Sequence, residues 1–170
     1  MLKSIGRNVS SATVRDSCGA ADVVVLATPW PAAQDVIEAA GDLKGKIVVD
    51  CSNPIAEDMK GLSTGLTTSA AERVADLAKG ARVVKCFNTT GVQNMIDPVY
   101  GSQSITMFLC GDNAEAREVV AQLAHDLGFE VCDAGPLYAA RFLEPMAMLW
   151  VHLAYVQALG PGFAFKILKR

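Results

Sequence analysis

Short apolar runs alternate along the chain with segments of helical character. Five runs have the length and composition of β-strands, and they lie at residues 22–27, 46–50, 82–87, 105–110 and 129–133. The first three are almost continuously apolar, which is typical of parallel strands covered by helices on both faces. Strands separated by helical segments at this spacing predict right-handed crossovers and a parallel sheet, so we expect an α/β fold.

Four other segments are predicted to be helices, at residues 31–40, 69–78, 113–127 and 139–159. The third begins at a cap formed by Asp112 or Asn113 and stops at Gly128. The fourth is apolar nearly all round, and Pro145 marks either a kink in it or its true start. Because a surface helix has a single apolar stripe, an all-round apolar helix rich in Met and Trp indicates a subunit interface or a ligand pocket.

The composition allows one domain with a real core, because 51% of the 170 residues are hydrophobic. A net charge of −3 without any run of like charges argues against nucleic acid or an anionic membrane as a partner. No stretch resembles a secretory signal, and the most apolar stretch, residues 146–159, is shorter than the roughly 20 residues that span a bilayer. The five cysteines, odd in number and without a C-x-x-C pair, indicate a reduced cytoplasmic protein without a metal site.

Candidate binding residues follow the predicted strands, because ligands of open α/β sheets bind beyond the carboxyl ends of the strands. All are small, polar or turn-forming and none carries a charge; they are Thr28, Pro29 and Trp30 after the first run, Asn53 and Pro54 after the second, Asn88 and Thr89 after the third, and Gly135, Pro136 and Leu137 after the fifth. Taken singly, each loop is also an ordinary turn. Together on one edge of one sheet, they suit a neutral ring lying across backbone groups better than acid–base chemistry on a charged substrate.

The segments DVVVLATPW, KIVVDCSNP, VVKCFNTTG and DAGPLYAARFLEPMAMLW, in this order and spacing, resemble the NADPH-dependent deazaflavin reductase-like family of dinucleotide-binding oxidoreductases. That family is related to pyrroline-5-carboxylate reductase and to the reductase domain of membrane ferric reductases. The resemblance implies a Rossmann-like, mainly parallel sheet. It places a partial NAD(P)-binding domain at residues 1–137 and a C-terminal helical segment at residues 138–170.

The resemblance also implies hydride transfer between NADP and a deazaflavin or another small acceptor. The residues implied to bind the cofactor are Thr28, Pro29, Trp30, Gln34, Asn53, Pro54, Asn88 and Thr89. Those implied to close the acceptor side are Gly135, Pro136, Leu137 and Arg141. A hydride that moves between two stacked rings needs distance and orientation more than a proton donor, so no catalytic residue is assigned.

One part of the family pattern is not found in the sequence. Family members begin with a strand, a G-x-G-x-x-G turn and a helix that bind the pyrophosphate of the cofactor. The first 20 residues here contain only Gly6 and Gly19, so we expect a sheet without its first βαβ unit, and the choice between NAD and NADP stays open. The run at residues 22–27 would then lie at the sheet edge, where it pairs with another chain or is covered by the first residues.

The leading interpretation is an NADP-linked oxidoreductase that forms a homodimer and whose activity is impaired by loss of the glycine-rich turn. The alternative from another class is a non-catalytic scaffold domain that keeps the fold and dimerises but binds no dinucleotide. A reductase of small imines or of ferric chelates would share the fold, and only a screen of acceptors separates it from a deazaflavin reductase.

Four further side chains have competing interpretations. Trp30 either stacks on a ring or packs under the next helix. Arg141 either pairs with Glu144, three residues along the same helix, or meets a phosphate or carboxylate. Lys85 is interpreted as structural, with its ammonium reaching the end of a strand, rather than as an acid at the hydride site. His152 is interpreted as packed or at an interface rather than as catalytic.

Overall fold

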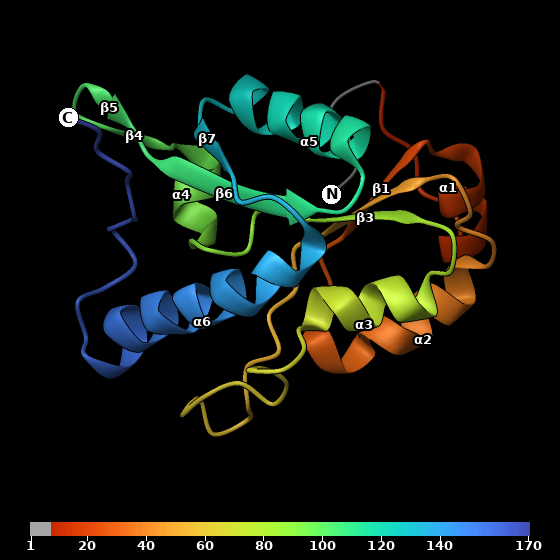
Figure 1. The fold of residues 1–170 in the computed structure, drawn as a ribbon, viewed down its shortest axis with the longest axis horizontal. Coiled ribbons are helices and arrows are strands. Elements are labelled where there is room, and N and C mark those ends of the chain that lie inside the picture. The colour runs from red at the N-terminus through yellow and green to blue at the C-terminus, as the bar shows by residue number, and fades with distance from the viewer. Residues whose placement is uncertain (1–7) are drawn as a thin grey trace.

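The computed structural model describes residues 8–170. These residues form one five-stranded sheet in the order β1-β2-β3-β6-β7, with helices on both faces (Figure 1). The strands are β1 (Val23–Leu26), β2 (Ile47–Asp50), β3 (Arg82–Lys85), β6 (Thr106–Gly111) and β7 (Glu130–Asp133). Each lies within one or two residues of a run expected from the sequence, so the prediction of an α/β fold with a mainly parallel sheet is confirmed.

The direction of one strand differs from the expectation. β1, β2 and β3 run parallel, and β7 runs parallel to β6. β6 itself is antiparallel to β3, with Lys85 opposite Cys110, so the expectation of a parallel sheet throughout is wrong at this strand. Between β3 and β6 the chain forms the short helix α4 (Val92–Ile96) and the hairpin of β4 (Val99–Tyr100) and β5 (Gln103–Ser104). This connection has no helix long enough to carry the chain back along the sheet to the end at which β3 begins. The chain therefore enters β6 antiparallel to β3.

Helices cover the sheet on two faces. The core on one face includes residues of α1 (Val14–Ala20), α2 (Ala33–Ala40), α3 (Ala70–Leu77) and α6 (Ala140–Val151), whereas α5 (Ala114–Asp126) packs on the other face (Figure 1). Successive side chains of a strand point to opposite faces, so Val48 joins the first core while Ile47 and Val49 join the second. None of the helices in residues 8–170 is long and apolar enough to cross a membrane.

Short polar side chains cap the first turns of α1, α3 and α5, and a glycine ends α5. Ser69 Oγ accepts a hydrogen bond (3.1 Å) from the backbone N–H of Glu72 at the start of α3, and Asn113 Oδ1 caps α5 through the N–H of Ala116 (2.8 Å). Gly128 follows α5 with a φ of +91°, a conformation that favours glycine. Helix α1 was not expected from the sequence, because it is short and buries only Cys18.

The long apolar helix expected at residues 139–159 is present. A 3-10 turn (Leu137–Ala139) precedes α6 and a π-helical turn (His152–Val156) follows it, with Pro145 inside α6 rather than at its start. Beyond it, the C-terminal residues contact both α6 and the sheet. Trp150 Nε1 donates to the carbonyl oxygen of Phe163 (2.9 Å), and the N–H of Thr106 donates to the carbonyl oxygen of Phe165 (3.2 Å).

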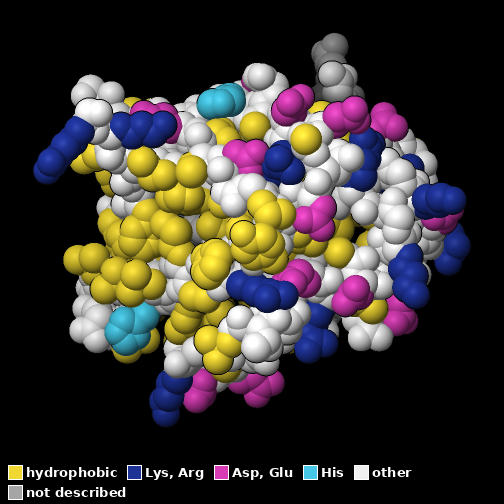
Figure 2. Space-filling model, in the orientation of Figure 1, with side chains coloured by type: hydrophobic (Ala, Val, Ile, Leu, Met, Phe, Trp, Pro, Cys, Tyr) yellow, Lys and Arg dark blue, Asp and Glu magenta, His cyan; other side chains and the backbone are white. Residues whose placement is uncertain are grey.

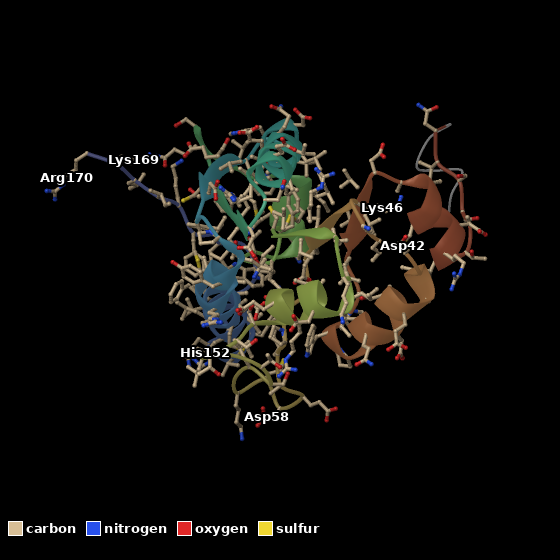
Figure 3. The ribbon with its side chains drawn as sticks, turned by 45° about the vertical axis from the view of Figure 1, so that its right-hand side comes forward. Asp42, Lys46, Asp58, His152, Lys169 and Arg170 are labelled. Atoms are coloured by element: carbon tan, nitrogen blue, oxygen red, sulfur yellow. The ribbon has the colours of Figure 1, made fainter. Side chains whose placement is uncertain are left out.

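β1 is the edge strand of the described sheet, next to β2 only. Val25 at its centre is 57% exposed, and a cavity of about 370 Å³ lies beside it, lined mostly by apolar residues of α1, β1 and α2. Lys46 secures α1 by donating to the carbonyl oxygens of Gly19 (3.1 Å) and Ala21 (2.6 Å) (Figure 3). The prediction that this edge pairs with another chain or is covered by the first residues stays a prediction, because residues 1–7 lie outside the described part.

Candidate functional site

The parallel strands β1, β2 and β3 end at the same edge of the sheet, and the loops that follow them form the candidate site. Asn53 and Asn88, which follow β2 and β3, are joined by two hydrogen bonds. Asn53 Nδ2 donates to the carbonyl oxygen of Asn88 (2.9 Å), and Asn88 Nδ2 donates to Asn53 Oδ1 (3.0 Å). Thr28 follows β1, whose Leu26 pairs with Asp50 at the end of β2. The sequence therefore located three of the four loops correctly.

The fourth predicted loop lies elsewhere. Since β6 is antiparallel to β3 and β7 follows the direction of β6, the carboxyl end of β7 points away from the edge at which β1–β3 end. The carbonyl oxygen of Gly135 bonds the N–H of Gly111, which sits opposite Val84, and Leu137 is buried in the core. The expectation that Gly135, Pro136 and Leu137 share an edge with the other three loops is wrong. α6, which follows them, crosses back and brings Leu143 to the candidate site.

Two buried side-chain polar atoms of residues 8–170 have no hydrogen-bond partner, and both belong to predicted cofactor residues. They are Thr28 Oγ1 and Asn88 Oδ1. An unsatisfied buried oxygen of this kind costs about 1–3 kcal/mol. Such groups in a native protein require an explanation, and a ligand or water donor that completes them is one. In the chain without a ligand, neighbouring protein atoms shield both oxygens from solvent. A ligand therefore reaches them only after a local movement of side chains.

The backbone turn before Asn88 is strained. Phe87 has a φ of +58°, a left-handed conformation that a bulky residue without special support avoids. The strain costs about 1–3 kcal/mol, and such residues cluster at binding sites. Packing maintains the turn, because the Phe87 ring contacts Phe129 edge-on (centroids 6.4 Å apart) and the following Asn88 and Thr89 are buried.

A second part of the site is an open cavity of about 360 Å³ between the start of α2 and α3. Trp30, Gln34, Thr64, Arg73 and Asp76 line it, with Pro31 and Leu77. Trp30 is half-buried and also packs against the core, so its ring is available to the cavity from one side only. Gln34 Nε2 is held by Glu38 (2.8 Å). The long loop between β2 and α3 borders this region and projects from the sheet, with Asp58 near its tip (Figure 3).

Of the two interpretations of Arg141, pairing with Glu144 is wrong and contact with a carboxylate is confirmed. Arg141 instead donates through Nε (2.9 Å) and a terminal nitrogen (2.5 Å) to the carboxylate of Glu72 on α3. These bonds hold the pKa of Glu72 below its usual value. Glu144 is fully buried and meets Lys85 (3.0 Å), which also bonds Asp50 (2.9 Å). The sequence indicated a structural Lys85 but did not reveal its two carboxylate partners.

His152 lies at the outer surface near the end of α6 (Figure 3). It is half-buried, and its Nε2 is 3.3 Å from the side-chain nitrogen of Gln157. It therefore lies away from the strand-end loops, in agreement with a structural role.

Three thiols near the sheet are expected to be unreactive. Burial, followed by the charge of Asp50, raises the pKa of Cys51 to about 12, and burial raises the pKa of Cys110 to about 12 and that of Cys86 still further. With no thiolate present at neutral pH, these cysteines are not nucleophiles. Alkylation of the folded chain at pH 8, followed by mass spectrometry, should leave all three unmodified. Modification of Cys51 as fast as a free cysteine would contradict this.

A mainly parallel sheet with helices on both faces defines a Rossmann-like α/β fold, and uncharged polar residues follow its parallel strands. Residues 1–54 match the model of the family described as NADP oxidoreductase, coenzyme F420-dependent. The solved structure of a putative F420-dependent NADP reductase from Arthrobacter sp. FB24 is 32% identical, with a TM-score of 0.84 over 93% of this chain and 74% of that one. The chain thus belongs to the F420-dependent NADP oxidoreductase family.

Two curated relatives are also similar to the chain. The F420-dependent NADP reductase of Methanocaldococcus jannaschii is 29% identical over 145 residues, which cover 82% of this chain. The chain spans 65% of the length of that enzyme. The metalloreductase STEAP3 of Rattus norvegicus is 34% identical over 110 residues, which cover 64% of this chain and 21% of that protein.

Proposed function

We propose that this chain holds the nicotinamide half of NADP and a hydride acceptor in an oxidoreductase. The main support for this proposal is that two buried oxygens, Thr28 Oγ1 and Asn88 Oδ1, have no hydrogen-bond partner in residues 8–170. Both follow the ends of strands, where folds of this kind bind ligands. The carboxamide of nicotinamide supplies N–H donors that these oxygens lack. The family and the relatives named above support NADP as the cofactor.

The side chains at the site suit orientation rather than proton transfer. Asn53 fixes Asn88 through their two hydrogen bonds, and Asn88 also donates to the carbonyl oxygen of Leu143 (3.3 Å). Both Asn88 donor hydrogens are thereby used, which leaves its oxygen as the free group. When bound, NADP supplies the hydride. Orientation of its ring against an acceptor is then the contribution of the chain.

The experiment compares two threonine-to-valine substitutions. Thr28→Val removes an oxygen that bonds nothing in residues 8–170, so the stability should stay equal or rise, while the loss of one hydrogen bond to the cofactor weakens NADPH binding by about threefold to tenfold. Thr106→Val, in β6, removes an oxygen that already accepts from the N–H of Ile167 (3.0 Å), and should lower stability without changing affinity. Fluorescence titration with NADPH and urea unfolding measure both quantities.

Two results would count against the proposal. If the two variants bound NADPH with equal affinity, Thr28 would not be part of the site. The absence of saturation of the unsubstituted chain at millimolar NADPH would favour the scaffold alternative.

The acceptor we propose is a deazaflavin coenzyme, on the basis of the family and of the reductase relatives. A screen that follows NADPH oxidation with a deazaflavin, a cyclic imine and a ferric chelate separates this acceptor from the other two. The deazaflavin should react at least tenfold faster than either. A faster reaction with the ferric chelate would support a metalloreductase activity instead.

A homodimer through α6 is a further expectation. Apolar side chains gather over α6 and the C-terminal residues (Figure 2). The exposed large apolar residues of this part of the chain are Tyr138, Phe142, Leu149, Tyr155, Val156, Leu159 and Leu168. Exposed apolar patches of this kind mark protein contacts. Leu149→Arg, at a side chain 49% exposed, should convert dimers to monomers in light scattering without loss of fold. A variant that stays dimeric would exclude α6 as the contact.

A further inference from the structure

Three charged side chains are fully buried together beneath the candidate site. Asp50 ends β2, Lys85 ends β3 and Glu144 lies in α6, and each is 0% exposed. Isolated charges cannot be buried at such a place, because the loss of hydration exceeds what packing returns. The three charged groups must therefore pair closely with one another. Their hydrogen bonds show which neighbouring residues they hold in place.

Every hydrogen of the Lys85 ammonium has its own acceptor. Lys85 Nζ donates to Asp50 Oδ2 (2.9 Å), to Glu144 Oε1 (3.0 Å) and to the carbonyl oxygen of Ser52. Those acceptors come from the end of β2, from α6 and from the loop after β2. A lysine has three donors and no acceptor, so Lys85 is fully satisfied and its position is fully determined.

Both carboxylates are also fully paired, because each of their oxygens accepts at least one hydrogen bond or ion pair. Asp50 Oδ1 accepts from the N–H (2.9 Å) and the hydroxyl (2.6 Å) of Ser52. Glu144 accepts from the N–H groups of Ala70 (2.9 Å) and Ala71 (3.1 Å) at the start of α3. That helix end carries a partial positive charge, which offsets the one excess negative charge of the cluster.

We infer that this cluster positions the site, with Lys85 and Asp50 fixing Ser52 and thereby the neighbouring Asn53, which in turn orients Asn88. Ser52 is bonded through its N–H, its hydroxyl and its carbonyl oxygen, all to the cluster. Asn53 follows directly and forms two bonds with Asn88. Glu144 joins the same cluster to α6, whose Leu143 carbonyl oxygen accepts from Asn88. Lys85 is a positioning residue, because it acts on Asn88 only through these groups.

The test removes the charges and keeps the shapes. Lys85→Met alone leaves two buried carboxylates without a cation and threatens folding, so the main variant combines Asp50→Asn, Lys85→Met and Glu144→Gln. The amide oxygen of Asp50→Asn still accepts from Ser52, and the single amide oxygen of Glu144→Gln accepts from one of the N–H groups of Ala70 and Ala71, but no ammonium reaches the Ser52 carbonyl oxygen. Val120→Ala, at a fully buried residue of α5 in the opposite core, is the control for a loss of stability alone.

Two readouts follow. Hydrogen exchange of the Asn53 and Asn88 side-chain amides, observed by NMR in the chain without ligand, should accelerate at least tenfold in the triple variant and less than twofold in Val120→Ala. The dissociation constant of NADPH should rise at least tenfold in the triple variant only. This second readout rests on the proposed function, whereas the first does not. Loss of amide protection in a chain that binds no NADPH would overturn the function and keep the positioning role.

The inference would be overturned if the triple variant kept the amide protection and the NADPH affinity of the unsubstituted chain. The cluster would then be structural only. Equal effects of the triple variant and Val120→Ala would overturn it as well. Should the triple variant fail to fold, Glu144→Gln alone decides the question. It keeps the bonds of Lys85 to Asp50 and Ser52, and should accelerate exchange of the Asn88 amide more than that of Asn53. Unchanged exchange of both would contradict the coupling to α6.

Discussion

Replacement of Glu144 by leucine is expected to lower the free energy of unfolding by about 3–5 kcal/mol. The substitution leaves the Lys85 ammonium with one carboxylate, and it leaves the N–H groups of Ala70 and Ala71 without an acceptor inside the core. Each orphaned donor adds a cost of its own. Urea unfolding followed by circular dichroism measures the change.

The control for this loss is Glu118→Leu. Glu118 is exposed on α5, and a surface substitution of this kind changes stability by about 0.5 kcal/mol or less. If Glu144→Leu were within about 0.5 kcal/mol of the unsubstituted chain, the size of a surface effect, the ion pair and helix contacts assigned to Glu144 would be wrong.

The second large effect is expected for Gly91→Ala, in the loop after β3. A Cβ at this position would lie 2.5 Å from Cη2 and 2.9 Å from Cζ2 of Trp150, closer than van der Waals contact allows. Trp150 cannot easily move away, because its ring stacks on Phe163 (centroids 5.4 Å apart) and its Nε1 bonds the carbonyl oxygen of Phe163. The overpacking should cost about 1–3 kcal/mol and displace α6 relative to the loop.

Gly162→Ala is the matched substitution. A Cβ at Gly162 meets no atom of residues 8–170 within 4 Å, so stability should stay the same or rise slightly. Thermal unfolding gives the stability of both variants, and the near-ultraviolet circular dichroism of tryptophan reports the displacement of Trp150. A Gly91→Ala variant with the stability and the spectrum of the unsubstituted chain would show that Trp150 is not held as described.

The strands and most helices could be predicted from the sequence because their information is local. Continuous apolar runs such as that of β2, the Ser69 and Asn113 caps, and glycine stops each depend on a few neighbouring residues. The same holds for the three loops after β1–β3, whose convergence follows from parallel topology. α1 and α4 were missed because they are short and bury little, which leaves a weak periodic pattern.

What could not be predicted depends on pairing between distant residues. The reversal of β6 follows from the absence of a crossover helix after β3, and this one reversal moves Gly135 away from the expected edge. Glu144 meets Lys85 and the start of α3 across more than 50 residues of sequence, so its spacing to Arg141 suggested the wrong partner. The two unpartnered oxygens are a property of the packed site and have no sequence signature.

The most direct test of the proposed nicotinamide site is an NMR titration of the chain with NADPH. If Thr28, Asn53 and Asn88 hold the cofactor, the backbone signal of Thr28 and the side-chain amide signals of the two asparagines should show the largest shifts and should saturate together. Shifts that are absent at millimolar NADPH, or that centre on residues away from the ends of β1–β3, would contradict the site.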